Sequence, residues 1–374
     1  MSHYLISCGG TGGHLAPGIA LAEGLIARGD SATLLVSGKL IDTRLLEKYP
    51  SLDFVRIPGA PLVRDPAGLA RFVWSQTHGV GFGLRLVRAT RPAAIVGFGG
   101  FTTGAMVLAG VLCRVPVALH EANRVPGRTI RLFSRLARRV YLPPGVLLTG
   151  VGPAARRHAA LPVRREITRR PREEARARLG LDPTRTTLVV LGGSQGAGAL
   201  NTWVRRQLPE FAAAGVQVCC ITGPGHPVAA EPAGRDASGL AVPAVFLPFC
   251  DDMASLLSAA DLAVSRAGAG TLAELARCET PALLVPYPHA ADNHQQANAD
   301  FFAQQGGGLV LEQPKLDQLG ALARGLLADP ARLARFRTRL RQMDRPGTLD
   351  LIIRDLDSLH PGTGHPMPAP AAPA

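Results

Sequence analysis

The sequence predicts two doubly wound α/β domains that face each other across a cleft. Two glycine-rich turns indicate this fold class, GGTGGH at residues 9–14 and GGSQGA at residues 192–197. Each turn follows a short apolar run and opens a helical pattern, one in either half of the chain. A chain of 374 residues is also too long for one ordinary core and long enough for two.

The first half alternates short apolar runs with helical stretches. We expect a helix over residues 17–28, because Gly29 follows it as a stop signal. Runs without polar alternation are typical of parallel strands that are buried on both faces of a sheet. Strands are predicted at residues 4–8, 32–36, 54–57, 94–96, 117–120 and 139–142. The first domain is expected to span residues 1–155.

The same alternation starts again after a connector that is rich in arginine and proline. A helix should begin near Ala199, directly after the second glycine turn. Strands are predicted at residues 187–191, 216–221, 245–247, 262–264 and 282–285. The second domain is expected to span residues 156–345. Apolar residues at helical spacing then predict a terminal helix within 346–360 that packs back across the domain joint, and residues 361–374 read as a disordered tail.

The charge of the chain is concentrated in one segment. The formal net charge is +13, and residues 123–180 hold fifteen arginines against three glutamates. A local basic face attracts polyanions such as nucleic acid, phospholipid headgroups or a phosphorylated substrate. The sequence has no Cys/His zinc pattern and no aromatic-rich RNA-binding segment, so a membrane surface or an anionic substrate ranks above nucleic acid.

The cysteines and the apolar segments indicate in which cellular compartment the protein is located. The six cysteines lack C-x-x-C spacing and are expected to be buried, reduced thiols. Residues 1–10 lack the basic region and the long apolar stretch of a signal peptide, so we expect a cytoplasmic protein. The apolar stretch 104–113 is well short of the roughly 20 residues that span a bilayer. Any membrane contact should therefore be peripheral.

The glycine turns suit a diphosphate. Backbone N–H groups at a strand-to-helix turn point at one spot, with the positive end of the helix behind them. Neither turn has the lysine of a P-loop, and residues 9–13 lack the spacing of a Rossmann dinucleotide fingerprint. A tight connection between strand and helix remains the structural alternative for either turn taken singly.

Polar residues of the second half could contact a nucleotide sugar. The segment 265–274 places Glu274 one turn into a helix, where a carboxylate can accept hydrogen bonds from both ribose hydroxyls or simply favour the helix dipole. Gln295 and Gln296 follow a strand end and suit sugar hydroxyls. The spacing of His289, Asp292 and His294 disfavours a metal site, so no metal and no cofactor is expected. The D-x-D string at 355–357 is interpreted as a solvated helix face.

Polar residues of the first half could form an acceptor pocket opposite the nucleotide. The sequences His-Glu-Ala-Asn at 120–123 and FGGFTTG at 98–104 each follow a strand, and His14 lies at the first glycine turn. A helix-start cluster is the structural alternative. Arg128, Arg131, Arg135 and Arg138 recur at helical spacing and predict an amphipathic basic helix, either at a membrane surface or as a core helix with a solvated face.

A second apolar stretch could lie beside that basic helix. Large apolar residues recur over 69–84 and could supply a membrane-insertion patch. Glycines at positions 79, 81 and 83 weaken the prediction of a helix there.

Seven ordered motifs make the chain resemble the MurG family of peptidoglycan N-acetylglucosaminyltransferases. The likeness covers about residues 3–310, and it implies a GT-B architecture of two Rossmann-like domains. The donor UDP-N-acetylglucosamine would be held mainly by the second domain, while the undecaprenyl-pyrophosphoryl-N-acetylmuramoyl-peptide lipid I approaches the first. The motifs are GGTGGHLAPGIALAEGL (9–25), VGFGGFTTG (96–104), HEAN (120–123), LGGSQGA (191–197), PFCDDM (248–253), SRAGAGTLAEL (265–275) and DNHQQANA (292–299).

The resemblance also implies roles for single residues. On the donor side, Ser194 would bind the UDP diphosphate with backbone help from Ala269, Gly270 and Thr271, and Cys250 would lie beside uracil. Glu274 would bind ribose, and Gln295 and Gln296 the sugar hydroxyls. From the opposite lobe, Asn123 would contact the donor sugar, and Thr11, Gly12, Gly13 and His14 would border the reacting centre.

Two positions depart from the family pattern. The family's G-N-P-V-R connector is aligned here with residues 149–156, which leaves the Asn missing and the Arg displaced to Arg156. Ala122 replaces the Gln that is usual in H-E-Q-N. Both changes are compatible with weaker donor binding or an altered acceptor.

The resemblance implies an inverting transfer of N-acetylglucosamine to the C4 hydroxyl of lipid-linked N-acetylmuramic acid, forming lipid II without a divalent ion. His14 is the first candidate for the general base and Glu121 the second. A UDP-sugar epimerase and a catalytically weak, membrane-docked UDP-sugar-binding module are the alternatives. The expected location is the cytoplasmic face of the bacterial inner membrane, where the basic segment would meet anionic lipid.

Overall fold

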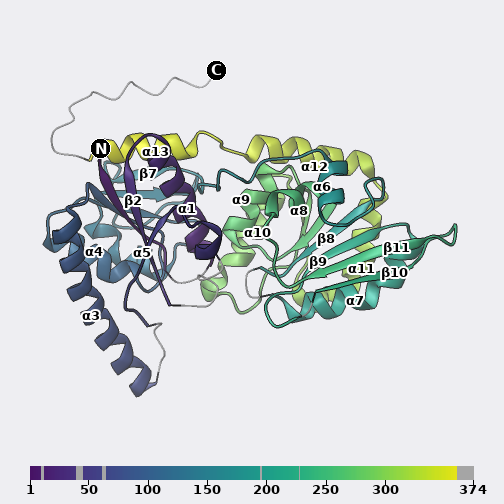
Figure 1. Ribbon diagram of the computed structural model, residues 1–374, viewed down its shortest axis with the longest axis horizontal. Helices are drawn as coiled ribbons and strands as arrows, with labels where there is room; N and C mark the ends of the chain where they lie inside the picture. Colours follow the sequence, from purple (N-terminus) through teal and green to yellow (C-terminus); the bar gives the residue numbers. More distant parts are fainter. Residues whose placement is uncertain (10–11, 39–44, 61–64, 194–195, 227, 360–374) are drawn as a thin grey trace.

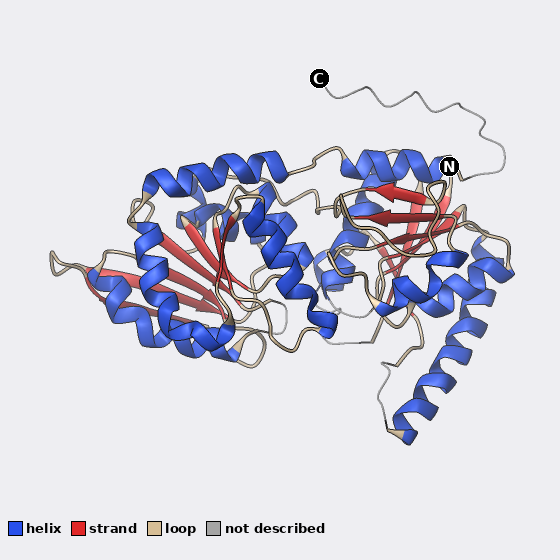
Figure 2. Ribbon diagram, turned by 180° about the vertical axis from the view of Figure 1, so that it is seen from behind, coloured by secondary structure: helices blue, strands red, loops and turns tan. Residues whose placement is uncertain are grey.

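The computed structural model describes residues 1–9, 12–38, 45–60, 65–193, 196–226 and 228–359. These residues form two lobes, each built on one seven-stranded sheet that is covered by helices (Figures 1 and 2). The predicted fold class, two doubly wound α/β units, is confirmed.

The first lobe has an entirely parallel sheet in the order β3-β2-β1-β4-β5-β6-β7. The strand order reverses between β1 and β4, which is where open α/β sheets place their ligands. The strands are β1 (His3–Ser7), β2 (Ser31–Val36), β3 (Asp53–Arg56), β4 (Ala94–Gly97), β5 (Val117–His120), β6 (Arg139–Leu142) and β7 (Arg156–His158). Since β7 pairs with β6, the sheet continues slightly beyond the expected boundary at residue 155.

Helices cover both faces of this sheet: α1 (Gly12–Ala27), α3 (Pro66–Thr90), α4 (Thr103–Leu112), α5 (Arg128–Phe133) and the 3₁₀ turn η1 (Ser134–Leu136). α3 extends away from the lobe in Figure 1. Its glycines do not prevent the helix, because two of them allow close packing on α4. A Cβ on Gly83 would lie 2.9 Å from the Ala109 Cβ, and one on Gly79 would lie 3.0 Å from the Ala105 Cβ. No helix among the described residues is both long and apolar enough to cross a bilayer.

The predicted basic helix is shorter than expected. α5 ends at Phe133, η1 follows, and the backbone N–H of Arg138 bonds the carbonyl of Val117 beside the sheet. Ile130 is buried, as the amphipathic pattern required. Only Arg128 and Arg131 therefore lie on the α-helix.

The second lobe repeats the arrangement in the order β10-β11-β9-β8-β12-β13-β14, in which β10 is antiparallel to β11. Its strands are β8 (Thr187–Leu191), β9 (Gln217–Ile221), β10 (Ala229–Arg235), β11 (Ala241–Leu247), β12 (Leu262–Ser265), β13 (Ala282–Leu284) and β14 (Gly308–Val310). Its helices are α6 (Arg172–Arg178), α7 (Gly198–Ala213), α8 (Met253–Ala259), α9 (Ala269–Arg277), α10 (His294–Gln304), α11 (Leu316–Leu327) and α12 (Pro330–Met343), with 3₁₀ turns η2 (Ala291–Asn293) and η3 (Gln313–Lys315).

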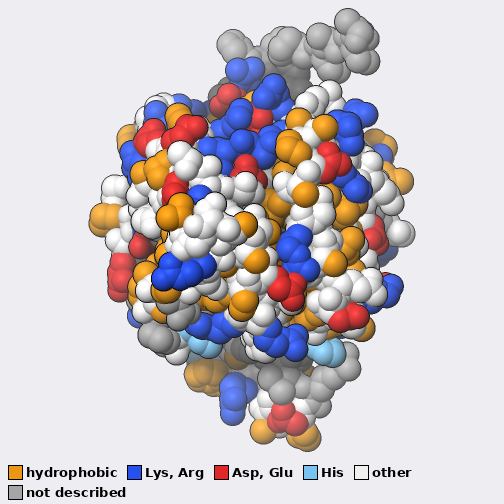
Figure 3. Space-filling view, turned by 90° about the vertical axis from the view of Figure 1, so that its right-hand side faces the viewer, with side chains coloured by type: hydrophobic (Ala, Val, Ile, Leu, Met, Phe, Trp, Pro, Cys, Tyr) orange, Lys and Arg blue, Asp and Glu red, His pale blue; other side chains and the backbone are white. Residues whose placement is uncertain are grey.

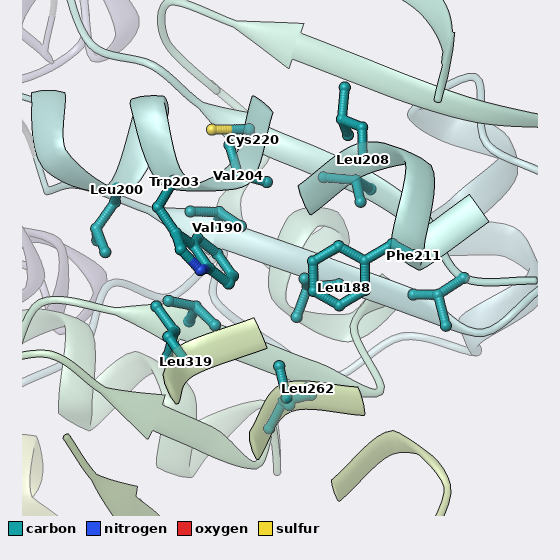
Figure 4. Close-up of a cluster of buried hydrophobic side chains, with 14 of the residues drawn as sticks. Leu188, Val190, Leu200, Trp203, Val204, Leu208, Phe211, Cys220, Leu262 and Leu319 are labelled. Atoms are coloured by element: carbon teal, nitrogen blue, oxygen red, sulfur yellow. The ribbon is translucent and has the colours of Figure 1, made fainter. Parts of the chain in front are cut away.

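One core of the second lobe lies between the sheet and α7. Trp203 and Phe211 extend from α7 toward Leu188 and Val190 of β8 (Figure 4). The two rings meet edge to face with centroids 6.0 Å apart, an arrangement that aromatic pairs prefer. This packing holds α7 against β8, the strand that precedes the second glycine turn.

The terminal helix α13 (Thr348–Asp357) leaves the second lobe and packs on α1 of the first. Ile352, Ile353 and Leu356 join the core around Tyr4 and Leu25. The close approach depends on the absence of a side chain at Gly24, where a Cβ would lie 2.8 Å from Leu349 Cδ2.

The solvated face expected for the D-x-D string is wrong for Asp355. This residue is 4% exposed and accepts hydrogen bonds from the Tyr141 hydroxyl at 2.9 Å and from the Nε atoms of Arg139 and Arg157 at 3.0 and 3.1 Å. Arg28 donates to Asp357 at 2.6 Å. The two carboxylates therefore fasten α13 to the first lobe.

Candidate active site

The first-lobe candidates lie at the carboxyl ends of β1, β4 and β5. Gly12, Gly13 and His14 form the first turn of α1, while Thr11 is outside the described residues. A Cβ built on Gly99, in the turn after β4, would lie 3.3 Å from His14 Nε2. Gly99 has a φ of 99°, which side chains rarely adopt, so glycine here provides both the turn and the space for the imidazole. His14 and the 98–104 turn are thereby brought together, as expected.

Glu121 organises the loop that follows β5. Its Oε1 accepts hydrogen bonds from the backbone N–H and the side-chain amide of Asn123, at 2.7 and 3.0 Å, and its Oε2 accepts the Gly127 N–H at 2.6 Å. The side chain is 3% exposed, and burial raises the pKa of its carboxyl while these hydrogen bonds act in the opposite direction. Both carboxylate oxygens are thus engaged in holding Asn123 and its loop.

His120 is a buried neutral base beneath that loop. Its Nε2 donates to the carbonyl of Ala160 at 3.0 Å, and burial lowers its pKa to about 4. The ring lies against Phe98 and Tyr141, with centroids 5.3 and 6.1 Å away. His120 therefore links the end of β5 to the connector instead of facing a substrate.

The second glycine turn requires glycine at both of its described ends. A Cβ on Gly192 would lie 2.3 Å from the Ala197 nitrogen, and one on Gly196 would lie 2.5 Å from the Thr222 carbonyl oxygen. The bare backbone therefore allows β8 to turn directly into α7 beside the end of β9. Ser194, the residue expected to bind the diphosphate, is outside the described residues.

Ala269, Gly270 and Thr271 form the first turn of α9, after the cap residue Gly268. Gly268 has no side chain with which to cap the helix, so the first N–H groups of α9 can bond an anion. Cys250 precedes α8 and is buried, which raises the pKa of its thiol to about 11. The Cys250 thiol is therefore neutral near pH 7.

Glu274 lies in the second turn of α9 and is buried against an arginine that the sequence analysis did not single out. Arg164 donates to Glu274 Oε1 at 2.9 Å, and its side chain is only 6% exposed. Arg164 ends the tripeptide Pro162-Val163-Arg164, which matches the last three positions of G-N-P-V-R. That tripeptide is the signal that could have located it. The match of G-N-P-V-R to residues 149–156 is therefore wrong. Arg156 lies in β7 at the edge of the first sheet, and the arginine of the motif corresponds to Arg164.

Arg164 also bonds the first lobe. It contacts the hydroxyl of Tyr49 at 3.2 Å, and Tyr49 in turn donates to Glu166 at 2.7 Å. Lys48 donates to Glu166 at 2.8 Å and to the Asp251 carbonyl. Arg164 therefore joins Glu274 of the second lobe to Tyr49 of the first.

Gln295 and Asn298 of α10 connect the second-lobe loops to the first lobe. Gln295 Oε1 accepts the N–H groups of Ala267 and Tyr287 at 3.3 and 3.0 Å, and thus positions the turn before α9. Asn298 donates to Asn123 Oδ1 at 3.0 Å and accepts the Arg124 N–H at 2.9 Å. Asn298 was missed, although it lies in the DNHQQANA motif. It brings Asn123 against the second lobe.

Gln296 and the two arginines of α5 bond carboxylates instead of pointing into the candidate site. Gln296 donates to Asp300 at 2.8 Å on the exposed side of α10. Arg131, predicted either at a membrane surface or on a solvated helix face, forms an ion pair with Asp292, and Arg128 lies 3.5 Å from the same carboxylate. Asp292 and Asn293 both have positive φ, 51° and 52°, which is uncommon outside glycine and costs energy. Among the described residues, no three His, Cys, Asp or Glu side chains gather as a metal site.

The two lobes and the polar edges at which they meet define the class of protein, a two-lobed glycosyltransferase of the GT-B type. Family models agree with this: the glycosyltransferase family 28 N-terminal domain matches residues 4–142, and the glycosyltransferase family 28 C-terminal domain matches residues 187–343. The calicheamicin glycosyltransferase CalG4 has the same fold at 16% identity, with a TM-score of 0.67 over 96% of this chain and 98% of its own.

Three relatives narrow the class. A protein of Opitutus terrae named UDP-N-acetylglucosamine--N-acetylmuramyl-(pentapeptide) pyrophosphoryl-undecaprenol N-acetylglucosamine transferase is 55% identical over 99% of both chains. One of the same name from Desulforudis audaxviator is 36% identical over 95% of this chain and 98% of its own. The crystal structure of Acinetobacter baumannii MurG gives a TM-score of 0.73 at 26% identity, over 96% of this chain and all of that one. The chain belongs to the MurG family, as the seven motifs predicted.

Proposed function

We propose that the protein is an inverting glycosyltransferase that moves N-acetylglucosamine from UDP-N-acetylglucosamine to the C4 hydroxyl of lipid-linked N-acetylmuramoyl-peptide. The observation that carries the proposal is the 55% identity, over 99% of both chains, to the Opitutus terrae transferase named for this donor and acceptor. The product is lipid II, the disaccharide-peptide precursor of peptidoglycan.

The second lobe holds the donor in this proposal. The turn at 192–197, with Ser194, and the first turn of α9, with Ala269, Gly270 and Thr271, receive the diphosphate. Backbone N–H groups at helix starts stabilise the negative charge that develops on the leaving UDP. Glu274 binds the ribose hydroxyls with Arg164 holding its carboxylate in place, and main-chain atoms at Cys250 contact uracil. Gln295 and Gln296 contact the sugar.

The first lobe presents the acceptor, with Thr11, Gly12 and Gly13 at its diphosphate. His14 removes the proton from the C4 hydroxyl as that oxygen attacks the anomeric carbon from the face opposite UDP. Glu121 is the second candidate base. Because both of its oxygens bond the loop, we assign it the positioning of Asn123, which contacts the donor sugar.

Membrane contact is proposed through α3. Leu69, Val73 and Trp74 recur on this helix, and each is more than half exposed. Figure 2 shows α3 extending away from the body of its lobe. Apolar side chains on such a helix can enter the headgroup region of the cytoplasmic leaflet of the inner membrane, where the acceptor lipid lies. Replacing Val73 and Trp74 by Ser should reduce binding to phosphatidylglycerol vesicles without changing UDP affinity.

The decisive experiment is a transfer assay with labelled UDP-N-acetylglucosamine and a lipid I analogue. The proposal expects label in the lipid and stoichiometric UDP that appears only when the acceptor is present. Conversion of the donor to an epimer without acceptor would instead identify an epimerase. Tight UDP binding with no transfer would identify a binding module.

A further inference from the structure

A basic basin lies on the second lobe at the end of the connector, and the proposed reaction makes no use of it. Its volume is about 610 Å³, and its charged lining residues are Arg169, Arg170, Arg172, Arg176, Glu173 and Asp261. These arginines belong to the segment that concentrates the net charge of the chain. Figure 3, which looks onto the end of the second lobe, shows Lys and Arg side chains gathered in its upper part, where Figure 1 has α6 and α12.

Positive charge exceeds negative charge around the basin. Asp261 is shared by Arg176 at 2.7 Å, Arg337 at 3.5 Å and Arg172 at 3.7 Å. Glu279 is shared in the same way by Arg169 at 3.0 Å and Arg341 at 2.8 Å. Arg170 pairs with Asp252 at 3.2 Å. Six guanidinium groups thus share three carboxylates, and with Glu173 of the lining the balance is six positive charges against four negative ones.

The neighbouring positive charges act on Arg337 of α12, which is partly buried beside them. Burial, together with the repulsion of Arg172, Arg169 and Arg176, lowers its pKa to about 10. Its Nε is buried and has no hydrogen-bond partner among the described residues. A buried donor without a partner and a cluster of like charges both cost free energy, and a bound anion would lessen the repulsion.

We propose that this basin is a binding site for a phosphate-bearing anion. A guanidinium group matches the geometry of a phosphate and can donate two parallel hydrogen bonds to two of its oxygens. Arg176 is held rigidly, because it also donates to the carbonyls of Ala259 and Pro183 at 3.1 and 2.9 Å. The side chains of Arg169 and Arg172 are 49% and 34% exposed and can turn toward an anion. One buried arginine and two partly exposed ones form the site.

The source of the phosphate is a soluble compound instead of a lipid headgroup. In Figure 1 the basin elements α6 and α12 lie at the upper right, whereas α3, with its exposed apolar side chains, lies at the lower left on the other lobe. A membrane that receives α3 would leave the basin in solution. Binding at the basin does not require the transfer reaction.

The test is titration of the full-length protein with inorganic pyrophosphate by calorimetry at constant ionic strength, with saturating UDP present to occupy the nucleotide site. The paired substitution Arg169→Ala and Arg172→Ala should weaken pyrophosphate binding by about tenfold or more. The matched control is Arg206→Ala with Arg335→Ala, which removes the same charge from exposed positions of the same lobe. The control should bind as the wild type does.

A second arm uses phosphatidylglycerol vesicles without pyrophosphate. Equal vesicle binding by the basin variant and the control supports a soluble ligand. Loss of vesicle binding in the basin variant alone would assign the phosphate to a lipid headgroup and overturn the soluble source. Equal pyrophosphate affinity in all three proteins, with equal vesicle binding, would overturn the site itself.

Discussion

His14 and Glu121 both lie at strand ends of the first lobe, but their surroundings differ. Glu121 is buried with each carboxylate oxygen bonded to its own loop, whereas His14 is half-buried on the first turn of α1, above the bare backbone of Gly99. A general base must reach the hydroxyl that it deprotonates. The residue-scale geometry therefore favours His14 as the base and Glu121 as the holder of Asn123.

Replacing His14 by Ala should lower the turnover number by about 10²- to 10⁴-fold, the usual contribution of general-base catalysis. The affinity for UDP should change little, because the second lobe binds the nucleotide in this proposal. Steady-state kinetics with a lipid I analogue and calorimetry with UDP measure the two quantities. A turnover number close to the wild type would remove His14 from the role.

The variant Glu121→Gln tests whether Glu121 holds its loop in place or acts in catalysis. An amide nitrogen in place of Oε2 cannot accept the Gly127 N–H, so the loop loses a hydrogen bond and the melting temperature should fall. A variant that keeps its melting temperature but loses turnover would indicate a catalytic role for Glu121.

His120 makes stability depend on pH. Its pKa is about 4 in the folded chain against 6.5 for the free side chain, so between these values the unfolded chain binds the proton more tightly. Stability should therefore be complete above pH 6.5 and fall as the pH drops toward 4, by about 3 kcal/mol in total.

Urea unfolding between pH 5 and 7.5 measures this dependence. His120→Gln keeps an N–H donor for the Ala160 carbonyl but does not titrate, so its stability should vary less with pH. The exposed His226→Gln is the control and should follow the wild type. Identical pH profiles for His120→Gln and the wild type would refute the assignment.

At the scale of elements, the glycines of α3 have different roles: some allow close packing on α4, and one faces open space. Glycine lowers helix propensity, yet α3 runs from Pro66 to Thr90 because Asp65 caps it and Gly79 and Gly83 admit α4. Gly81 differs, since a Cβ there would meet no atom within 4 Å. The packing of α3 on α4 supports the apolar residues that the helix presents at its surface.

Gly81→Ala and Gly83→Ala should therefore change stability in opposite directions. Alanine at 81 gains about 0.5–1 kcal/mol of helix propensity. Alanine at 83 would meet Ala109 and Met106, and overpacking of this kind costs about 1–3 kcal/mol. Chemical unfolding of the two variants gives both values, and changes of the same sign would contradict the packing argument.

At the scale of the whole molecule, the described residues join the lobes through several regions, among them the ion pair between Arg131 of α5 and Asp292. Loop 121–127 bonds α10, Lys48 and Tyr49 bond the connector near Glu166, and α13 of the chain end packs on α1. The first two lie at the carboxyl edges that carry the candidate site. In the proposed reaction, the bonds that hold the two lobes together would also align the donor sugar with the acceptor hydroxyl.

Asn298→Ala removes the two bonds across the lobes, to Asn123 and to Arg124, and a bond to the Ala267 carbonyl within the second lobe. With about 1 kcal/mol for each of the two hydrogen bonds, the KM for the donor should rise about 30-fold. The radius of gyration from small-angle scattering should increase as the lobes separate. Asn298→Asp retains the acceptor for Arg124 but not the donor to Asn123, and we expect an intermediate KM. Unchanged KM and radius in Asn298→Ala would contradict the role.

Much of the fold followed from local pattern. The central strands β1, β4, β5, β8 and β12 were predicted because each is a continuous apolar run that ends in a glycine or a polar turn, and those signals lie within a few residues of each other. The strands β7, β10 and β14 were not predicted. They lie toward the sheet edges, and β7 and β14 have only three residues each, too few for a periodicity to appear.

The sequence by itself determined the two-lobed α/β architecture, the glycine turns and the family, because hydrophobic periodicity and ordered motifs are properties of neighbouring residues. Only the tertiary structure showed that Arg164 holds Glu274, that Asn298 holds Asn123 and that Asp355 is buried against Tyr141. These partners are 110, 175 and 214 residues apart in the chain. Such contacts arise from the packing of whole elements, and no local pattern encodes them.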